Sequence, residues 1–497
     1  RLPDMQQRSI RVSEPSRDAS TARPSLIGWI AVAVMVPVLL TAGLEWADLA
    51  AYHYDWDPGE GDNLYYAARL AAGEPLYGDY DRYPMTGSCY PPFYHALLAP
   101  LVGLFGREVV IGRIVSWLAM LAGAVLAGRI TREVSDRRWA GVLAGLLYLG
   151  TPITRQWACL ARVDALLVAL SLASIWFLCL GPVTRKRMLA GVTCGVLAVL
   201  TKQYALLFLL AGLVVLLRRD RRLGLYATLL AAGAGGILLA ILQWWSDRWF
   251  WHNVVTANAT DYSLAHMLRL QLTMLRECWP VLILGAAALA WREGRGVLLA
   301  VLVPGVLIAL LSGKDGASIN YQLPLMAGVA VLASATAARL ASTRWRTVLP
   351  VGLLIQAAIW IFLARVYTPG ETERLQLKWI EGIVRSFDGE VLIDRHMTLQ
   401  YRAGQPTLWE PCLLYYLYLY QRWNPEILVE DIRRQRFAAI FVSPNFLSGP
   451  LHAAMNRRYR RVESIYVPDW TGGTALALYK PVDADASAAT STAPDGE

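Results

Sequence analysis

Long, uninterrupted apolar segments constrain the fold of this chain more than any other feature. One runs over residues 26–44 (LIGWIAVAVMVPVLLTAGL), and similar blocks occupy residues 223–243 and 347–364. As helices, such segments are long enough to span the ~30 Å hydrocarbon core of a bilayer. Of the 497 residues, 56% are hydrophobic and only 17% are charged, which leaves too little polar surface for a soluble protein of this size. The sequence therefore predicts an α-helical, polytopic membrane protein.

Eleven transmembrane helices are expected. They are placed near residues 26–44, 108–128, 139–150, 165–180, 188–200, 205–217, 223–245, 280–291, 296–312, 322–338 and 347–366. The apolar stretch 93–106 is expected to be an interfacial or re-entrant helix, because a twelfth span there would move the Arg-rich loop 129–138 to the other side. Arg113 falls inside a predicted span, so its side chain should face protein or lie near an interface. No cleavable leader is expected, because the first block ends without an Ala-x-Ala site.

Basic residues set the predicted orientation. The loops on the amino-terminal side hold 21 Lys and Arg in 58 residues, whereas those on the opposite side hold 9 in 123. The positive-inside rule places the first set in the cytoplasm, and an odd number of spans then sends the C-terminal region outside. The expected location is the inner or plasma membrane. Anionic lipid headgroups account for the net charge of +9, so no nucleic-acid partner is expected.

The chain divides into four predicted segments. These are a disordered cytoplasmic N-terminus (1–25), a transmembrane domain (26–366) with a first outer loop at 45–106, a small extracytoplasmic α/β domain (367–481) and a disordered tail (482–497). In the α/β domain, strands are expected at 390–394, 438–442, 463–467 and 474–480, and helices at 371–387, 411–420 and 426–436.

The six cysteines show no paired metal-binding spacing. Four of them lie on the predicted outer side and could form a disulfide: Cys89, Cys159, Cys278 and Cys412. The alternative is that they are small apolar residues of the packed helices.

Unusual polar residues gather on this predicted outer side. Four acids, Asp55, Asp57, Glu60 and Asp62, lie in one eight-residue window. The others lie at the mouths of predicted spans: Arg162, Asp164, Lys202, Lys314, Asn320 and Tyr321. Ionisable residues at membrane depth are costly and are usually functional or paired for structure. Asp164 should therefore sit at the rim of a cavity, unless it forms a structural pair with Arg162.

Carboxylates and cations around one cavity suit the transfer of a sugar from a lipid phosphate. A carboxylate can remove the proton of an attacking hydroxyl. The departing phosphate needs no general acid, but it needs positive charge from Lys, Arg or a divalent cation. Direct displacement inverts the anomeric centre. Mg²⁺ or Mn²⁺ is compatible with the acidic cluster but is not indicated by it.

Five motifs resemble the GT-C superfamily of membrane glycosyltransferases, which includes protein O-mannosyltransferases and aminoarabinose transferases. They are GEGDNLYYAARLAAGEPLYGDY (59–80), CYPPFYHALLAPLVGLFG (89–106), ARVDALLVALSL (161–172), LAVLTKQYALL (197–207) and GKDGASINYQLP (313–324). The resemblance implies a polyprenyl-phosphate sugar as donor and a glycan, lipid or protein as acceptor.

The resemblance also implies roles for individual residues. A first-loop acid would be the catalytic base. Many members have an Asp-Glu pair there, but this chain reads Gly59-Glu60, so the role is carried to Glu60, with Asp62 and Asp57 as substitutes. Asp62 also fits the N-cap of a helix predicted over 62–72.

The remaining site residues are expected to bind substrate or shape the cavity. Asp164, which matches a second-loop acid, would bind acceptor, metal or a structural partner. Lys202 would bind the donor phosphate, unless it is a snorkelling interfacial lysine. The others are Arg162, Tyr90, His95, Lys314, Asn320 and Tyr321.

Two other classes of protein compete with a glycosyltransferase. A secondary transporter should show repeated halves and broken helices at the bilayer midplane. No internal repeat is apparent, and the polar residues gather at one face. A non-catalytic assembly protein of the cell envelope would leave Asp164 and Lys202 without a purpose.

Overall fold

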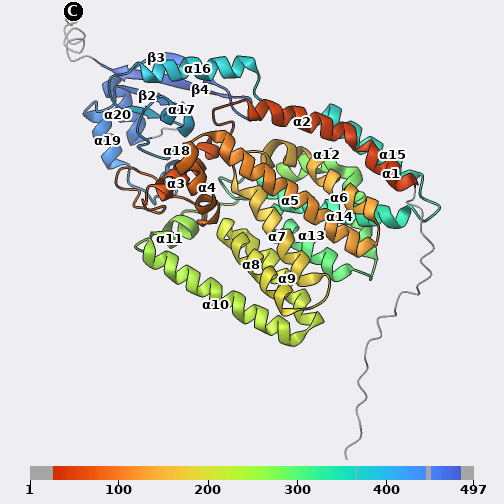
Figure 1. The fold of residues 1–497 in the computed structure, drawn as a ribbon. Helices are drawn as coiled ribbons and strands as arrows, with labels where there is room; N and C mark the ends of the chain where they lie inside the picture. The colour runs from red at the N-terminus through yellow and green to blue at the C-terminus, as the bar shows by residue number, and fades with distance from the viewer. Residues whose placement is uncertain (1–25, 365, 444–448, 483–497) are drawn as a thin grey trace, which may run out of the picture.

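A computed structural model describes residues 26–364, 366–443 and 449–482. The segments predicted to be disordered, 1–25 and 482–497, lie outside the described residues, except for Val482. Figure 1 shows a large helical domain with a small α/β domain, drawn in blue, packed at one end of it beside α3 and α4.

The helical domain contains the following α-helices: α1 (Leu26–Val34), α2 (Val36–Ala50), α3 (Pro58–Ala71), α4 (Phe93–Phe105), α5 (Val109–Ser135), α6 (Arg138–Gly150), α7 (Val163–Cys179), α8 (Arg185–Thr201), α9 (Leu206–Arg219), α10 (Arg221–Trp245), α11 (Trp249–Trp251), α12 (Leu264–Ala287), α13 (Arg295–Leu310), α14 (Leu323–Leu340) and α15 (Val348–Ala358). Short 3₁₀ or π turns join several of them, among them Gln203–Ala205 and Ile319–Gln322.

A helix lies at each of the eleven predicted spans. Among the described residues, six helical segments are long and apolar enough to cross a membrane: Leu26–Ala50, Val109–Ser135, Arg221–Trp245, Leu264–Ala290, Arg295–Gly313 and Ile319–Leu340. The boundary predicted at residue 280 was wrong, because α12 begins at Leu264, where Ser263 caps it by accepting the His266 N–H. Charged residues at 269 and 276 hid this continuous helix in the sequence.

Small residues let α14 pack at the centre of the bundle. Its sequence is LPLMAGVAVLASATAARL, and nearly every residue is buried. A Cβ at Gly328 would lie 3.2 Å from the Val301 carbonyl oxygen of α13, so the two backbones approach closely. α14 also packs against α5, α6 and α12. Helices can approach this closely in a bilayer because small residues at the interface expose little side chain.

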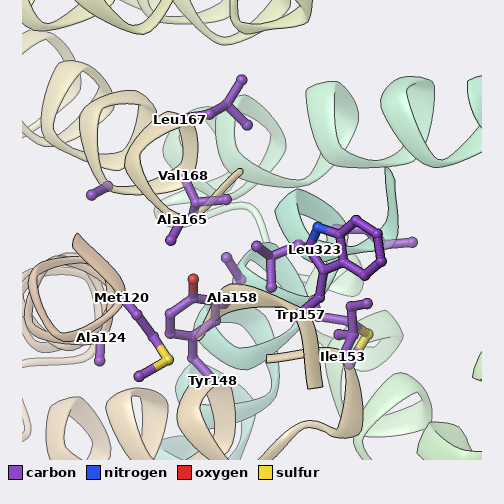
Figure 2. Packing of buried hydrophobic residues seen from close by; sticks show 14 of the residues in the cluster. Met120, Ala124, Tyr148, Ile153, Trp157, Ala158, Ala165, Leu167, Val168 and Leu323 are labelled. Atoms are coloured by element: carbon purple, nitrogen blue, oxygen red, sulfur yellow. The ribbon is translucent and has the colours of Figure 1, made fainter. Parts of the chain in front are cut away.

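The bundle core extends from α14 to α5, α6 and α7. Figure 2 shows part of it, in which Met120 and Ala124 of α5, Tyr148 of α6, and Ala165 and Val168 of α7 point toward one another. By contrast, α10 lies along the outside of the bundle in Figure 1 and buries few residues. The core fixes the start of α7, where Arg162 and Asp164 of the candidate site lie.

The small domain is built on a four-stranded sheet of order β1-β2-β4-β3. Its strands are β1 (Val391–Ile393), β2 (Ala439–Val442), β3 (Tyr459–Val467) and β4 (Thr474–Pro481). β1 and β2 are parallel, and β4 runs antiparallel to both of its neighbours. The domain's helices are α16 (Glu371–Arg385), α17 (Met397–Arg402), α18 (Pro411–Leu419), α19 (Glu426–Arg433) and α20 (Pro450–Arg458). Strands lie at all four predicted positions.

Alternating side chains give the sheet two buried faces. Val391 and Ile393 belong to the same apolar cluster as Ile380 of α16, whereas Leu392 packs in another cluster with Leu428 of α19 and Met455 of α20. Successive strand residues point to opposite faces, so helices on both sides bury the short strands completely.

Backbone bonds join the small domain to the loops that follow α2 and α3. Met85 N–H donates to the Leu408 carbonyl at 2.8 Å, and Glu410 N–H donates to the Met85 carbonyl at 3.0 Å. Trp470 N–H donates to the Trp56 carbonyl at 3.0 Å. These backbone hydrogen bonds hold residues 56–85 in a fixed position against the small domain.

Candidate functional site

A cavity of about 390 Å³ lies between the helical domain and the small domain. Its walls come from the loop after α2 and α3, the turns before α7, α9 and α14, and three segments of the small domain. The polar and charged residues used below are Asp57, Asp62, Tyr66, Tyr90, Arg162, Lys202, Lys314, Asn320, Tyr321, Arg395, Glu410 and Asp469, all of which line it. Most of the predicted site residues are thus brought together.

Asp57 begins α3 and also holds a cation of the cavity. Its carboxylate accepts the Gly59 N–H at 3.1 Å and forms an ion pair with Arg162 at 3.0 Å. The helix was predicted to begin at Asp62, which was wrong, because Asp57 is the N-cap and the Glu60 side chain completes the capping box. Burial raises the pKa of Asp57, and Arg162 partly offsets that shift. The Arg162–Asp164 pair, the alternative that the sequence left open, does not form, since Arg162 pairs with Asp57.

Glu60 points away from the cavity into the protein. Arg113 Nε and Nη2 donate to its two oxygens at 2.8 and 2.7 Å, and neither side chain is exposed. The backbone N–H groups of Ala161 and Trp56 donate at 2.8 Å each. Burial would raise the pKa of Glu60, but Arg113 and these backbone donors hold it below its usual range. The expectation that Glu60 is the catalytic base does not fit this position, because every oxygen is occupied and no substrate reaches it.

Arg113 is the interior partner of this carboxylate. Besides Glu60, it donates to the carbonyls of Leu49, Tyr52 and Tyr54 at 2.6–3.0 Å. The expectation that Arg113 faces protein is met by a side chain with 0% exposure. The pair thus joins α5 to the end of α2 and the start of α3.

Asp62 lies two residues further along α3 and faces the cavity. Residues two apart on a helix point in roughly opposite directions, so Glu60 and Asp62 cannot share an environment. Within the described part of the chain, no backbone or side-chain group hydrogen-bonds or ion-pairs with the Asp62 carboxylate. Burial raises the pKa of Asp62 to about 7, a shift that Arg162 partly opposes and Asp57 reinforces. A carboxyl group with this pKa is suited to take a proton near neutral pH.

Asp164 lies behind the cavity wall and organises three side chains that line it. Lys202 Nζ is 2.8 Å from its Oδ1, Asn320 Nδ2 donates to the same oxygen at 3.2 Å, and Trp157 Nε1 donates to Oδ2 at 2.9 Å. Both ions of the Asp164–Lys202 pair are nearly inaccessible, with side-chain exposures of 3% and 5%. Tyr321 places its ring centroid 4.9 Å from Lys202 Nζ. Lys202 is therefore a neutralised cation and not a snorkelling lysine.

Lys314 is the cavity cation that has no carboxylate within ion-pair distance in the described structure. Its Nζ lies 3.4 Å from the Tyr204 hydroxyl and 3.3 Å from Asn258 Oδ1. Burial lowers the pKa of Lys314 to about 8, so the ammonium is charged at neutral pH but only weakly solvated. An ammonium in that state is prepared to bind an anion.

The other predicted residues shape the walls. The Tyr90 hydroxyl accepts from Arg162 at 3.1 Å, and the Tyr321 hydroxyl lies 2.7 Å from that of Tyr204. His95 does not reach the cavity, because its Nε2 bonds Asn63 Oδ1 at 3.0 Å inside the protein. All six cysteines are free, so the disulfide left open by the sequence does not form.

Several cavity residues were missed in the sequence. Arg395, Glu410 and Trp470 all come from the small domain, and Trp157 precedes α7. The one available signal was Glu410, a single acid in the apolar stretch TLWEPCLLYYLYLY. Across the described residues, no three His, Cys, Asp or Glu side chains are grouped to hold a metal ion.

Comparisons with known proteins agree with this architecture. Residues 90–246 match the family model described as dolichyl-phosphate-mannose-protein mannosyltransferase. Over 328 residues the chain is 30% identical to undecaprenyl phosphate-alpha-4-amino-4-deoxy-L-arabinose arabinosyl transferase 2 of Pseudomonas fluorescens. That alignment covers 60% of this chain and 55% of the relative, so the chain matches about half the length of that protein.

Two solved structures share the fold. ArnT of Cupriavidus metallidurans, bound to undecaprenyl phosphate, has a TM-score of 0.59 at 16% identity, covering 91% of this chain and 98% of that one. The archaeal oligosaccharyltransferase AglB of Archaeoglobus fulgidus has a TM-score of 0.51 at 12% identity, covering 92% of this chain and 74% of that one. The chain is thus a multi-pass membrane protein with the fold of the GT-C glycosyltransferases. The resemblance to the GT-C superfamily that the motifs indicated is confirmed. The chain is similar in sequence to the Pseudomonas arabinosyl transferase and in fold to ArnT.

Proposed function

We propose that this chain transfers a sugar from a polyprenyl-phosphate donor to a hydroxyl group of an acceptor at the outer face of the cell membrane. The observation that carries the proposal is that Asp62 and Lys314 face the same cavity, a carboxylate and a cation that have no ion-pair partner among the described residues. The names of the relatives support it, since one acts on an undecaprenyl-phosphate sugar and another was solved with undecaprenyl phosphate bound.

In the proposed reaction, Asp62 is the base. It takes the proton of the acceptor hydroxyl as the acceptor oxygen bonds to the anomeric carbon. The bond from that carbon to the phosphate oxygen breaks, and its electron pair leaves with the phosphate. A direct displacement of this kind inverts the anomeric centre. Asp57 has a lesser claim to the role, because its carboxylate is occupied by Arg162 and the α3 backbone.

Positive charge for the departing phosphate is proposed to come chiefly from Lys314. Lys202, the residue first expected to bind it, is already neutralised by Asp164. Arg162 is shared with Asp57 and has 13% side-chain exposure, so it can offer a second contact. This assignment needs no metal ion.

The proposed orientation follows from the basic loops. The Arg-rich connections 129–138 and 218–222 lie on the predicted cytoplasmic side, and the cavity loops lie at the opposite ends of the same helices. The small domain and the cavity would then face the outside, where a lipid-linked sugar and an envelope acceptor can meet. The proposed divisions of the chain are a helical catalytic domain over 26–366 and an extracytoplasmic domain over 367–481.

The test is transfer by the purified protein in lipid nanodiscs. Radiolabelled polyprenyl-phosphate mannose, glucose, galactose, arabinose and aminoarabinose are each supplied with membrane-derived glycan, lipid and protein acceptors. We expect transfer from one donor, and Asp62→Asn should slow it by about 10²–10⁴-fold, the range of a lost general base. Asp81→Asn is the matched control, because Asp81 is an exposed acid of the same first outer loop, 45–106, that contains α3 and Asp62. No transfer from any donor, or an Asp62→Asn variant as fast as Asp81→Asn, would refute the proposal.

A further inference from the structure

Two carboxyl groups from distant parts of the chain face the cavity together. Asp62 lies on α3, and Tyr66 follows one turn later on the same helix face. The Tyr66 hydroxyl donates to Glu410 Oε2 at 3.2 Å and accepts the Gly87 N–H at 3.1 Å. Both Asp62 and Glu410 line the cavity. The α/β domain thus brings a second acid to the proposed base.

Glu410 is held firmly in this position. It is the N-cap of α18, where its Oε1 accepts the Leu413 N–H at 3.2 Å, and its residue exposure is 7%. Its own N–H bonds the Met85 carbonyl of the loop after α3. A carboxyl group in so fixed a place cannot turn away from a neighbouring negative charge.

The cations of the cavity do not neutralise this pair of acids. Arg162 is taken by Asp57 at 3.0 Å and Lys202 by Asp164 at 2.8 Å. The remaining ones are Arg395, 3.8 Å from Asp469, and Lys314, which contacts Tyr204 and Asn258. Among the described residues, neither Asp62 nor Glu410 has an ion-pair partner. Two such carboxylates facing one partly closed cavity repel each other, and keeping one proton removes the repulsion.

The surroundings of the pair decide which acid keeps that proton. The charged or titratable groups that interact with one or both of them include Asp55, Asp57, Tyr66, Tyr80, Cys89, Arg162 and Cys412. Burial raises the pKa of Asp62 to about 7, against the opposing effect of Arg162. Burial also raises the pKa of Glu410 well above its usual range, and the charge of Asp62 raises it further, whereas the hydrogen bonds from Tyr66 and the Leu413 N–H and the charge of Arg162 oppose the shift. Glu410 is the more deeply buried of the two, so the proton belongs to it.

We propose that Glu410 stays protonated beside ionised Asp62, so that the cavity offers one carboxylate base and one neutral hydrogen-bonding group to the acceptor hydroxyl. This inference rests on the proposed function. In the reaction, Asp62 accepts the hydroxyl proton, the new bond to the anomeric carbon forms and the bond to the phosphate oxygen breaks. Asp62 then loses its proton to water, while Glu410 keeps its own throughout. A cavity in which Asp62 alone is ionised also repels an anionic donor less than one in which both Asp62 and Glu410 are ionised.

Infrared titration of the purified protein tests the pair without any substrate. Subtracting the Asp62→Asn spectrum from the wild-type spectrum should leave a carboxylic acid band that disappears near pH 7, and subtracting the Glu410→Gln spectrum should leave one that persists to higher pH. Bands of other buried acids, such as Asp55, cancel in these differences. In Asp62→Asn the persistent band should disappear at a lower pH than in the wild type, because the neighbouring charge is gone. Asp81→Asn should leave both bands unchanged. The inference is overturned if the Glu410 band does not move in Asp62→Asn, or if the Glu410→Gln difference spectrum contains no band that persists above pH 7.

Activity gives a second, independent readout. Glu410→Gln keeps a neutral polar group and the cap of α18, so it should retain more transfer than Glu410→Leu, by about tenfold for a lost hydrogen bond of 1–1.5 kcal/mol. Equal rates for the two variants, or complete loss in Glu410→Gln, contradict a neutral role. If the wild type transfers no sugar at all, the proposed function fails while the infrared experiment still decides on the proton.

Discussion

Glu60→Gln should unfold this protein more easily, even though the residue lies in the motif that suggested a catalytic base. The carboxylate accepts two bonds from Arg113 and the N–H groups of Ala161, Trp56 and Asp57. Glutamine keeps one oxygen but turns an NH₂ group toward Arg113, which cannot accept from it. A guanidinium with 0% exposure is then left without its counter-charge.

The magnitude follows from that burial. Removing one partner of a buried ion pair costs about 3–5 kcal/mol, whereas breaking an exposed pair costs about 0–1 kcal/mol. The matched control is Glu74→Gln, whose carboxylate is 57% exposed and pairs with Arg69 at 3.2 Å. We therefore expect the free energy of unfolding to fall by about 3–5 kcal/mol in Glu60→Gln. Little change is expected in Glu74→Gln.

Denaturant titration of both variants, followed by tryptophan fluorescence, measures this difference. The pKa of Glu60 is lowered in the folded state, so its contribution is fully present above its ordinary pKa and is lost as the pH falls through the lowered folded-state pKa. The gap between wild type and Glu60→Gln should accordingly be constant at neutral pH and close in acid. If Glu60→Gln unfolds at the wild-type denaturant concentration yet transfers no sugar, Glu60 is a catalytic group and our reading of α3 is wrong.

Three further changes test the cavity. Lys314→Gln should raise the donor KM on the order of tenfold, because a charge-assisted bond to the donor is lost. Donor binding to the wild type should weaken above about pH 8, because Lys314 then loses its proton. Equilibrium binding of labelled donor to both proteins, measured across pH, checks both expectations. Gly59→Ala places a methyl group against the Arg162 guanidinium, which must move, so kcat/KM should fall while the unfolding midpoint stays near wild type. Lys202→Met leaves Asp164 buried without its cation and should cost about 3–5 kcal/mol of stability, part of which an added Asp164→Asn should restore in the same denaturant titration.

Long apolar segments were enough to predict most of the architecture. A helix lies at each predicted span, because a long apolar segment in a bilayer has few other ways to form its backbone hydrogen bonds. The four strands were visible for a related reason, since short runs such as AAIFV at 438–442 are buried on both faces. The start of α12 was missed where charges interrupt the apolar pattern.

The site was only partly predictable. The sequence grouped the acids of α3 correctly, but their spacing of two places them on opposite helix faces. Which face meets the cavity depends on Arg113, 53 residues later, which pairs with Glu60 and leaves Asp62 to the cavity. The ion-pair partner of Asp164 was also hard to predict. Lys202 is 38 residues away in sequence, yet it pairs with Asp164, whereas Arg162, two residues away, does not. Glu410 reaches the cavity through a domain contact that local pattern does not encode.

The backbone bonds between Met85 and residues 408–410 have a consequence for how such proteins diversify. One wall of the cavity belongs to the small domain, which is distant in sequence from the first loop. Backbone groups hold that wall in place, and backbone groups do not depend on the side chains present. Side chains at that wall can therefore change without loosening the junction. Exchange of the terminal module between homologues would then import a new set of contacts for the acceptor while the first loop and its base stay in place.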